Sequence, residues 1–217
     1  MAEIAMIHAT RAAISPVETA FAEIWPDASH WSLLDEGLTQ AVDRAGDLTD
    51  DISARFIALG EYAAAAGSDA LLFTCTAFGP PMEACQQKFD FPVLKPNDAM
   101  MDKALAIGGQ VGLLASHPVT LPMLSAQFEE MAADAGIAIT LHPKLAEGAW
   151  ADLQAGRREA HDSKLIEAAA ALSECDCVML AQFSMAPLKR ATEAVVEGEV
   201  LSSPHAAVEK LKALLAG

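Results

Sequence analysis

The chain has 217 residues, of which 53% are hydrophobic and 20% charged, and its 14 basic and 30 acidic residues give a net charge of −16. This length and hydrophobic content can supply one sizeable core or two smaller ones, which excludes an intrinsically disordered protein. The negative charge argues against nucleic acid and anionic membranes as main partners, because both are bound through basic patches.

Short apolar runs alternate with longer amphipathic runs from one end of the chain to the other. Strands are expected over residues 4–8, 31–34, 70–74, 93–94, 111–115, 138–141, 178–181 and 200–201. Helices are expected over residues 16–24, 49–66, 81–88, 100–107, 121–135, 161–173, 187–197 and 205–215. This alternation is typical of parallel sheets with βαβ crossovers, and uniformly apolar strands indicate helices on both faces. The sequence therefore predicts an α/β fold.

The second half of the chain repeats the first at a constant spacing. Ile4 begins the first expected strand, and Val111 begins the fifth, 107 positions later. Without a gap, the same spacing pairs Asp69 with Asp176, Pro80 with Pro187, and Trp31–Leu34 with Ala138–Leu141. We therefore expect two pseudo-symmetric α/β lobes, residues 1–109 and 110–217, each a parallel sheet flanked by helices. Ligands of open α/β sheets bind beyond the carboxyl ends of the strands, so the active site is expected in the cleft between the lobes.

The segment with the strongest chemical signal follows the third expected strand. There an apolar run ends in Thr74, Cys75 and Thr76, and Gly79 and Pro80 then open a helix. A thiol beside a helix N-terminus is expected to have a lowered pKa, and the flanking hydroxyls could bind a carboxylate. The alternative is a buried cysteine that packs as a small hydrophobic residue.

A Thr-Cys-Thr motif at this place, within duplicated α/β lobes, resembles the aspartate/glutamate/hydantoin racemase superfamily. The resemblance covers nearly the whole chain, including the first strand with its polar turn at His8 to Thr10, the Gly112–Ser116 strand and the closing Leu201–Pro204 segment. It implies cofactor-independent proton transfer at a carbon next to a carboxylate, with Cys75 as the catalytic residue. In these racemases two cysteines, one from each lobe, face each other across the substrate.

The position that corresponds to the second cysteine is occupied by Gln182. Glutamine does not exchange a proton near neutral pH, but its amide can bind a carboxylate or an enolate. Three other cysteines are expected to pack rather than to replace the missing thiol: Cys85, Cys175 and Cys177. A histidine or a water molecule could then act as the second base, or the enzyme could use a single base.

Polar residues after the expected strands supply the remaining candidates. The possible second acid or base is sought among His8, His117 and His205. Substrate binding is assigned to Thr10, Thr74, Thr76, Ser116, Thr120, Gln182 and Ser184. Hydroxyls and backbone amides at such turns can bind a carboxylate, although the same side chains can instead cap the helices that follow.

We therefore expect a racemase or isomerase that moves a proton at the α-carbon of a small carboxylate of amino-acid or hydantoin type. A one-base lyase or decarboxylase of the same superfamily is the first alternative, and a non-catalytic ligand-binding protein is the second. No cofactor or metal is expected, because nucleotide-binding glycine motifs and clustered metal ligands are missing from the sequence. A homodimer or larger homo-oligomer is left open.

The expected location of the protein is the cytoplasm. The first ten residues, MAEIAMIHAT, lack the basic segment of a signal peptide. The longest apolar stretch, residues 62–82, is interrupted by glycines, prolines and an aspartate, so no membrane span is expected. Four cysteines without a secretory signal indicate free thiols rather than disulfides.

Overall fold

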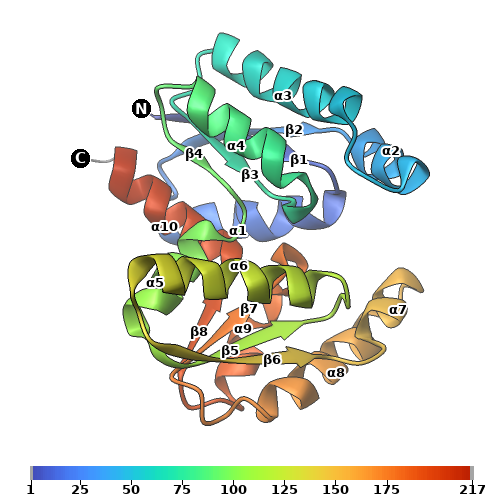
Figure 1. The fold of residues 1–217 in the computed structure, drawn as a ribbon, viewed down its shortest axis with the longest axis vertical. Coiled ribbons are helices and arrows are strands. Elements are labelled where there is room, and N and C mark those ends of the chain that lie inside the picture. The colour runs from blue at the N-terminus through green and yellow to red at the C-terminus, as the bar shows by residue number, and fades with distance from the viewer. Residues whose placement is uncertain (1, 216–217) are drawn as a thin grey trace. The chain divides into compact units, whose positions relative to one another are not determined.

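The computed structural model describes residues 2–215, which form two compact α/β units (Figure 1). The N-terminal unit comprises Met1–Ala99 and Ala207–Gly217, and the C-terminal unit comprises Met100–Ala206. Each unit contains a four-stranded parallel sheet, with strand orders β2-β1-β3-β4 and β6-β5-β7-β8. The expected α/β class with two parallel sheets is confirmed, and both sheets have the same topology.

The N-terminal unit is built around the apolar strands β1 and β3. Its elements are β1 (Glu3–His8), η1 (Arg11–Ala13), α1 (Ile14–Ile24), β2 (Ser29–Leu34), α2 (Gly37–Ala45), α3 (Asp50–Ala65), β3 (Ala70–Phe73), η2 (Thr76–Phe78), α4 (Gly79–Lys88) and β4 (Val93–Leu94). Helices α3 and α4 lie on one face of the sheet and α1 on the other (Figure 1). Ile7, Phe56 and Phe73 pack in the core between the sheet and α3. Burial on both faces explains why β1 and β3 are continuously apolar.

The C-terminal unit repeats this arrangement. Its elements are α5 (Asp98–Ile107), β5 (Gly109–Ala115), α6 (Thr120–Ala135), β6 (Ile139–Leu145), α7 (Ala149–Gln154), α8 (Arg158–Ala170), β7 (Cys177–Leu180), η3 (Phe183–Leu188), α9 (Lys189–Glu193), β8 (Glu199–Ser202) and α10 (Ser203–Leu215). The boundaries between the units fall inside α5 and α10. Helices α6 and α8 cover opposite faces of the sheet (Figure 1), and Leu114, Val178 and Leu165 meet in the core on the α8 side.

Two helices were not expected, and one differs from expectation. Helices α2 and α7 are short segments between β2 and α3 and between β6 and α8. The expected helix over residues 187–197 is wrong at both ends, because the structure has the 3₁₀-helix η3 followed by the five-residue α9. Pro187 lies inside η3 and supplies no N–H to a helical ladder, which explains why an α-helix begins only after it.

Equivalent hydrogen bonds occur in the two sheets at the spacing expected for the internal repeat. The Glu3 N–H donates to Asp69 Oδ2 over 2.9 Å, and the Asp69 N–H donates to the Glu3 carbonyl over 2.7 Å. The Gln110 N–H and Asp176 Oδ2 lie 2.7 Å apart, and the Asp176 N–H donates to the Gln110 carbonyl over 2.7 Å. Both pairs are separated by the expected 107 positions, as are the registers of β1 with β3 and of β5 with β7.

The ungapped match of Trp31–Leu34 with Ala138–Leu141 is wrong by four residues. Trp31 pairs with Ala5 in the first sheet, whereas Gly112, the equivalent of Ala5, pairs with His142. His142 lies 111 positions after Trp31 rather than 107. Helix α6 continues to Ala135, whereas α1 ends at Ile24. One additional helical turn of about 3.6 residues therefore accounts for the insertion.

Candidate active site

Cys75 lies directly beyond the carboxyl end of β3, the second of the two central strands in the N-terminal sheet. All four cysteines are free, and Cys75 is half-buried whereas Cys85, Cys175 and Cys177 are buried. The expectation that the three other cysteines pack in the interior is confirmed. Cys75 is therefore the most exposed of the four thiols.

The expected lowering of the Cys75 pKa is wrong in direction. Burial raises the pKa of the thiol, and a hydrogen bond from the Ala77 backbone N–H lowers it by a smaller amount. Helix α4 begins only at Gly79, because η2 lies between it and Cys75. The field of a helix terminus decays within about one turn, so the α4 dipole contributes little at the sulfur. The free thiol is therefore neutral at pH 7.

The Thr74 hydroxyl, which the sequence predicted to bind substrate, is hydrogen-bonded within the protein. Its side chain is buried, and Oγ1 lies 2.8 Å from His8 Nδ1 and 3.3 Å from the Ile7 carbonyl oxygen. The other ring nitrogen of His8, Nε2, lies 3.1 Å from Ser32 Oγ on β2. Ser32, His8 and Thr74 thus form a hydrogen-bonded chain across three strands.

His8 is poorly suited to be the second acid or base. Its side chain is fully buried, and burial lowers the pKa of the imidazole from 6.5 to about 4. Both ring nitrogens are occupied by hydroxyl groups. A neutral imidazole with both nitrogens bonded holds its neighbours in place and has no free proton-accepting position.

The two remaining candidates of the N-terminal unit lie at the starts of its 3₁₀-helices. The Thr10 hydroxyl accepts the Ala12 N–H over 3.4 Å and thereby caps η1, which is the capping alternative considered for this residue. Thr76 is half-buried and is the first residue of η2, one position after Cys75. Its assignment as a binding residue stays a prediction.

Gln182 and Ser116 meet at the carboxyl edge of the C-terminal sheet. Gln182 Oε1 accepts the Ser116 N–H over 3.1 Å and the Ser116 hydroxyl over 3.4 Å. The amide nitrogen Nε2 is buried and has no hydrogen-bond partner among the described residues. Ser116 is itself buried, and its hydrogen bonds orient the amide; its assignment as a binding residue stays a prediction. The amide therefore presents a donor that is available to an acceptor oxygen.

His117 and Thr120 lie at the turn between β5 and α6. His117 Nδ1 accepts the Val119 N–H over 3.2 Å, and burial lowers the pKa of the ring. The ring meets Trp150 edge-on with centroids 4.5 Å apart. Thr120 is the first residue of α6, and its N–H donates to the His117 carbonyl. Both residues contribute to the turn, and Trp150 is a neighbour that sequence patterns did not reveal.

Ser184 and His205 follow β7 and β8, as expected. The Ser184 carbonyl accepts a hydrogen bond from Arg158 Nη2 over 3.1 Å, so Arg158 holds the η3 segment. His205 Nδ1 lies 2.6 Å from Ser202 Oγ. Neither Arg158 nor Ser202 was a candidate, because Arg158 lies 26 residues from Ser184 along the chain and Ser202 is the last residue of the apolar strand β8.

Ser32 is the residue that the sequence could have revealed. It pairs in register with Met6, two residues before His8, so it lies on the same face of the sheet as the imidazole. A serine inside the expected strand Trp31–Leu34, beside a strand that ends in histidine, was the available signal.

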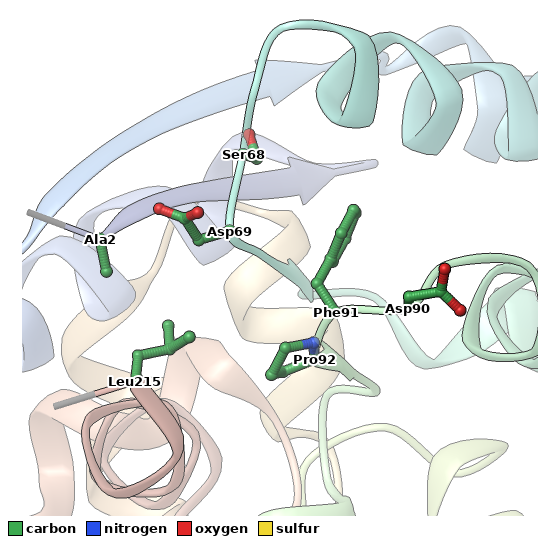
Figure 2. A pocket seen from close by; sticks show the side chains of 7 residues that line it. All are labelled: Ala2, Ser68, Asp69, Asp90, Phe91, Pro92 and Leu215. Atoms are coloured by element: carbon green, nitrogen blue, oxygen red, sulfur yellow. The ribbon is translucent and has the colours of Figure 1, made fainter. Parts of the chain in front are cut away.

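A cavity of about 510 Å³ lies at the opposite edge of the N-terminal sheet (Figure 2). Its lining residues are Ala2, Ser68, Asp69, Asp90, Phe91, Pro92 and Leu215. Asp69 precedes the first residue of β3, whereas Cys75 follows the last, so the cavity is separate from the thiol. Among residues 2–215, no cluster of three or more side chains suited to a metal ion is present. Within the same range no helix is both long and apolar enough to cross a membrane.

Comparison with solved structures identifies the same fold in several racemases. Allantoin racemase from Klebsiella pneumoniae superposes with a TM-score of 0.71 and 16% identity, covering 100% of this chain and 88% of that one. Picrophilus torridus aspartate racemase gives a TM-score of 0.72 and 14% identity, covering 98% and 94%. Glutamate racemase from Francisella tularensis, in complex with D-glutamate, gives 0.69 and 11%, covering 99% and 81%. Identities this low establish the fold alone.

A comparison with curated protein sequences gave no significant match. The model of the Asp/Glu/hydantoin racemase family, in contrast, matches residues 25–211, which include both central β3 and β7 strands and the segments that follow them. The match spans most of the chain and agrees with the duplicated parallel sheets. The chain therefore belongs to the Asp/Glu/hydantoin racemase family.

Proposed function

We propose that the protein is an isomerase that moves a proton at the α-carbon of a small carboxylate or hydantoin, with Cys75 as its acid or base. The observation that carries this proposal is the position of Cys75. It is the half-buried thiol among three buried ones, and it lies beyond the carboxyl end of a central strand. Membership of a racemase family supports the reaction class.

The raised pKa of Cys75 suits a weak carbon acid as substrate. Burial raises the thiol pKa, so the thiolate is scarce at pH 7 but is a stronger base once formed. A hydrogen bond from the Ala77 backbone N–H favours the thiolate and partly offsets the effect of burial on the pKa. Turnover is therefore expected to rise with pH above neutrality until the thiol is ionised. No cofactor is proposed for this chemistry: the Cys75 thiolate takes the α-proton, and inversion requires a second donor, a histidine or a water molecule, that delivers a proton to the opposite face of the carbanion.

Gln182 favours a one-base enzyme as the second candidate function. Racemisation requires a proton donor on each face of the α-carbon, and an amide does not ionise near neutral pH. The buried Nε2 of Gln182 is instead a fixed donor for a carboxylate or enolate oxygen, an arrangement that stabilises developing negative charge. In a lyase or decarboxylase that protonates its product from Cys75 alone, this donor would stabilise the enolate before protonation.

Isotope exchange distinguishes these reactions. The purified protein is incubated in deuterium oxide with aspartate, glutamate, alanine, hydantoins, allantoin and substituted malonates. Nuclear magnetic resonance reports loss of the α-proton, circular dichroism reports inversion, and carbon dioxide release is measured in parallel. Exchange with inversion supports the racemase, and carbon dioxide release supports the decarboxylase. Binding without exchange or decarboxylation across the panel contradicts an enzymatic role and supports a ligand-binding protein.

Two cysteine variants assign the chemistry to Cys75. Cys75→Ala should abolish every activity found, because it removes the ionisable group. Cys85→Ala is the matched control, since Cys85 is a buried thiol on α4 whose pKa is raised to about 11 by burial. The control should retain most of the activity. Activity that survives in Cys75→Ala and is lost in Cys85→Ala would contradict the assignment.

A further inference from the structure

The hydrogen-bonded chain of Ser32, His8 and Thr74 lies at the same end of the N-terminal sheet as Cys75, near the carboxyl ends of the strands. Thr74 is the residue immediately before Cys75, and its N–H donates to the Ile7 carbonyl over 3.1 Å. Strand β3 itself ends at Phe73, so this bond and the Thr74 hydroxyl are the last ties of the segment to β1. Beyond them Cys75 is extended, with φ −131° and ψ 124°, and η2 begins.

The hydrogen bonds assign a direction to the chain. Thr74 Oγ1 donates to the Ile7 carbonyl, so it accepts from His8 Nδ1–H. His8 Nε2 is then unprotonated and accepts from the Ser32 hydroxyl. Every polar atom of the buried imidazole is satisfied in this arrangement, which is the requirement for burying a neutral histidine without cost.

The duplication supplies an internal comparison. The C-terminal positions equivalent to Ser32, His8, Thr74 and Cys75 are occupied by Pro143, Ala115, Ala181 and Gln182. The C-terminal repeat, which lacks the thiol, thus lacks all three residues of the hydrogen-bonded chain. It keeps the strands and, at their amino ends, the hydrogen bond from a backbone N–H to an aspartate. A chain needed only to build the sheet would be useful in both repeats.

We propose that Ser32, His8 and Thr74 are positioning residues that hold the Thr74–Cys75 segment against β1 and thereby fix the orientation of the Cys75 thiol. Thr74 acts directly on the backbone of the segment, His8 fixes the Thr74 rotamer, and Ser32 fixes the imidazole. The role in turnover rests on the proposed function of Cys75. The effect of these residues on the ionisation of the Cys75 thiol is independent of that function, because it can be measured without a substrate.

The test is the rate of alkylation of Cys75 by iodoacetamide as a function of pH. Thr74→Val keeps the shape of the side chain and removes its hydroxyl. It should shift the midpoint of the alkylation curve upward by about one pH unit, the effect of losing one hydrogen bond to the thiolate. At a fixed pH below the midpoint, alkylation then slows roughly tenfold.

Two substitutions of His8 test the hydrogen bonds of its two ring nitrogens separately. An asparagine amide can replace Nδ1 and reach Thr74, whereas a glutamine amide can replace Nε2 and reach Ser32. His8→Asn should therefore stay closer to the wild-type midpoint than His8→Gln. Ser32→Ala should have the smallest effect, because Thr74 keeps its contact with the imidazole.

His161→Asn is the matched control, because His161 is a fully buried histidine on α8 in the other unit. It should cost stability without moving the Cys75 midpoint. An unchanged midpoint in Thr74→Val, or an equal shift in His161→Asn, would overturn the proposal. Faster alkylation at an unchanged midpoint would also overturn it, because it reports general loosening.

If a substrate is found, the variants of Ser32, His8 and Thr74 should lower kcat more than they raise KM. If no substrate is found while the midpoints shift as stated, the proposed function fails and the positioning role stands.

Discussion

The buried imidazole of His8 makes the stability of the protein depend on pH. In the unfolded chain a histidine takes up a proton below about pH 6.5, whereas in the folded protein the pKa of His8 is about 4. Between these values the unfolded state binds more protons, so the free energy of unfolding falls as the pH is lowered. Linkage over that interval gives a loss of about 2 kcal/mol between pH 8 and pH 5, and about 3 kcal/mol by pH 4.

The measurement is urea unfolding followed by far-ultraviolet circular dichroism at pH 8, 6.5 and 5. Other groups also titrate in this range, because the chain has 30 acidic residues and 6 histidines. His8→Asn keeps these groups and removes the one of interest, so the difference between wild type and variant isolates His8. The wild-type advantage should be largest at pH 8 and should shrink by about 2 kcal/mol at pH 5.

Parallel curves for wild type and His8→Asn would refute this reasoning. They would mean that the imidazole has the same pKa in both states, which is incompatible with a fully buried ring held by Ser32 and Thr74. A variant curve that falls more steeply than the wild-type curve would refute it as well, because the sign of the linkage would be reversed.

Three further predictions follow from the geometry. Gly109→Ala should destabilise the protein by about 2 kcal/mol in urea unfolding, because φ of Gly109 is +72° and a Cβ would overlap the Asp176 carboxylate. Gly46→Ala is the control: its φ is +74° but the space around it is open, so the loss of stability should be about half as large. Mass spectrometry after iodoacetamide treatment at pH 9 should find Cys75 modified first; modification of a buried cysteine before it would contradict the assigned exposures. Gln182→Cys should create or raise racemisation if the wild type uses one base, and unchanged racemisation would count against that reading.

The elements of the fold could be predicted wherever burial on two faces dictates the composition of a strand. Strands β3 and β7 and the interiors of β1 and β5 are apolar because helices cover both sides of each sheet, and their positions agree with the sequence pattern. The edge strands β2 and β6 are partly exposed, so their pattern is weaker. Their relative shift follows from one additional turn of α6, for which the ungapped match of the two halves makes no allowance.

The sequence by itself determined that a thiol follows a central strand and that glutamine stands at the equivalent position of the repeat. Only the tertiary structure decided how the polar neighbours are used. Thr74 and Ser116 were predicted to bind substrate, but they bind His8 and Gln182, residues that lie 66 positions away along the chain. The pKa of Cys75 likewise depends on burial by packed neighbours rather than on the helix that follows it. A local pattern places a polar side chain at a strand end, but the partner that satisfies it comes from another strand and is selected only when the sheet is assembled.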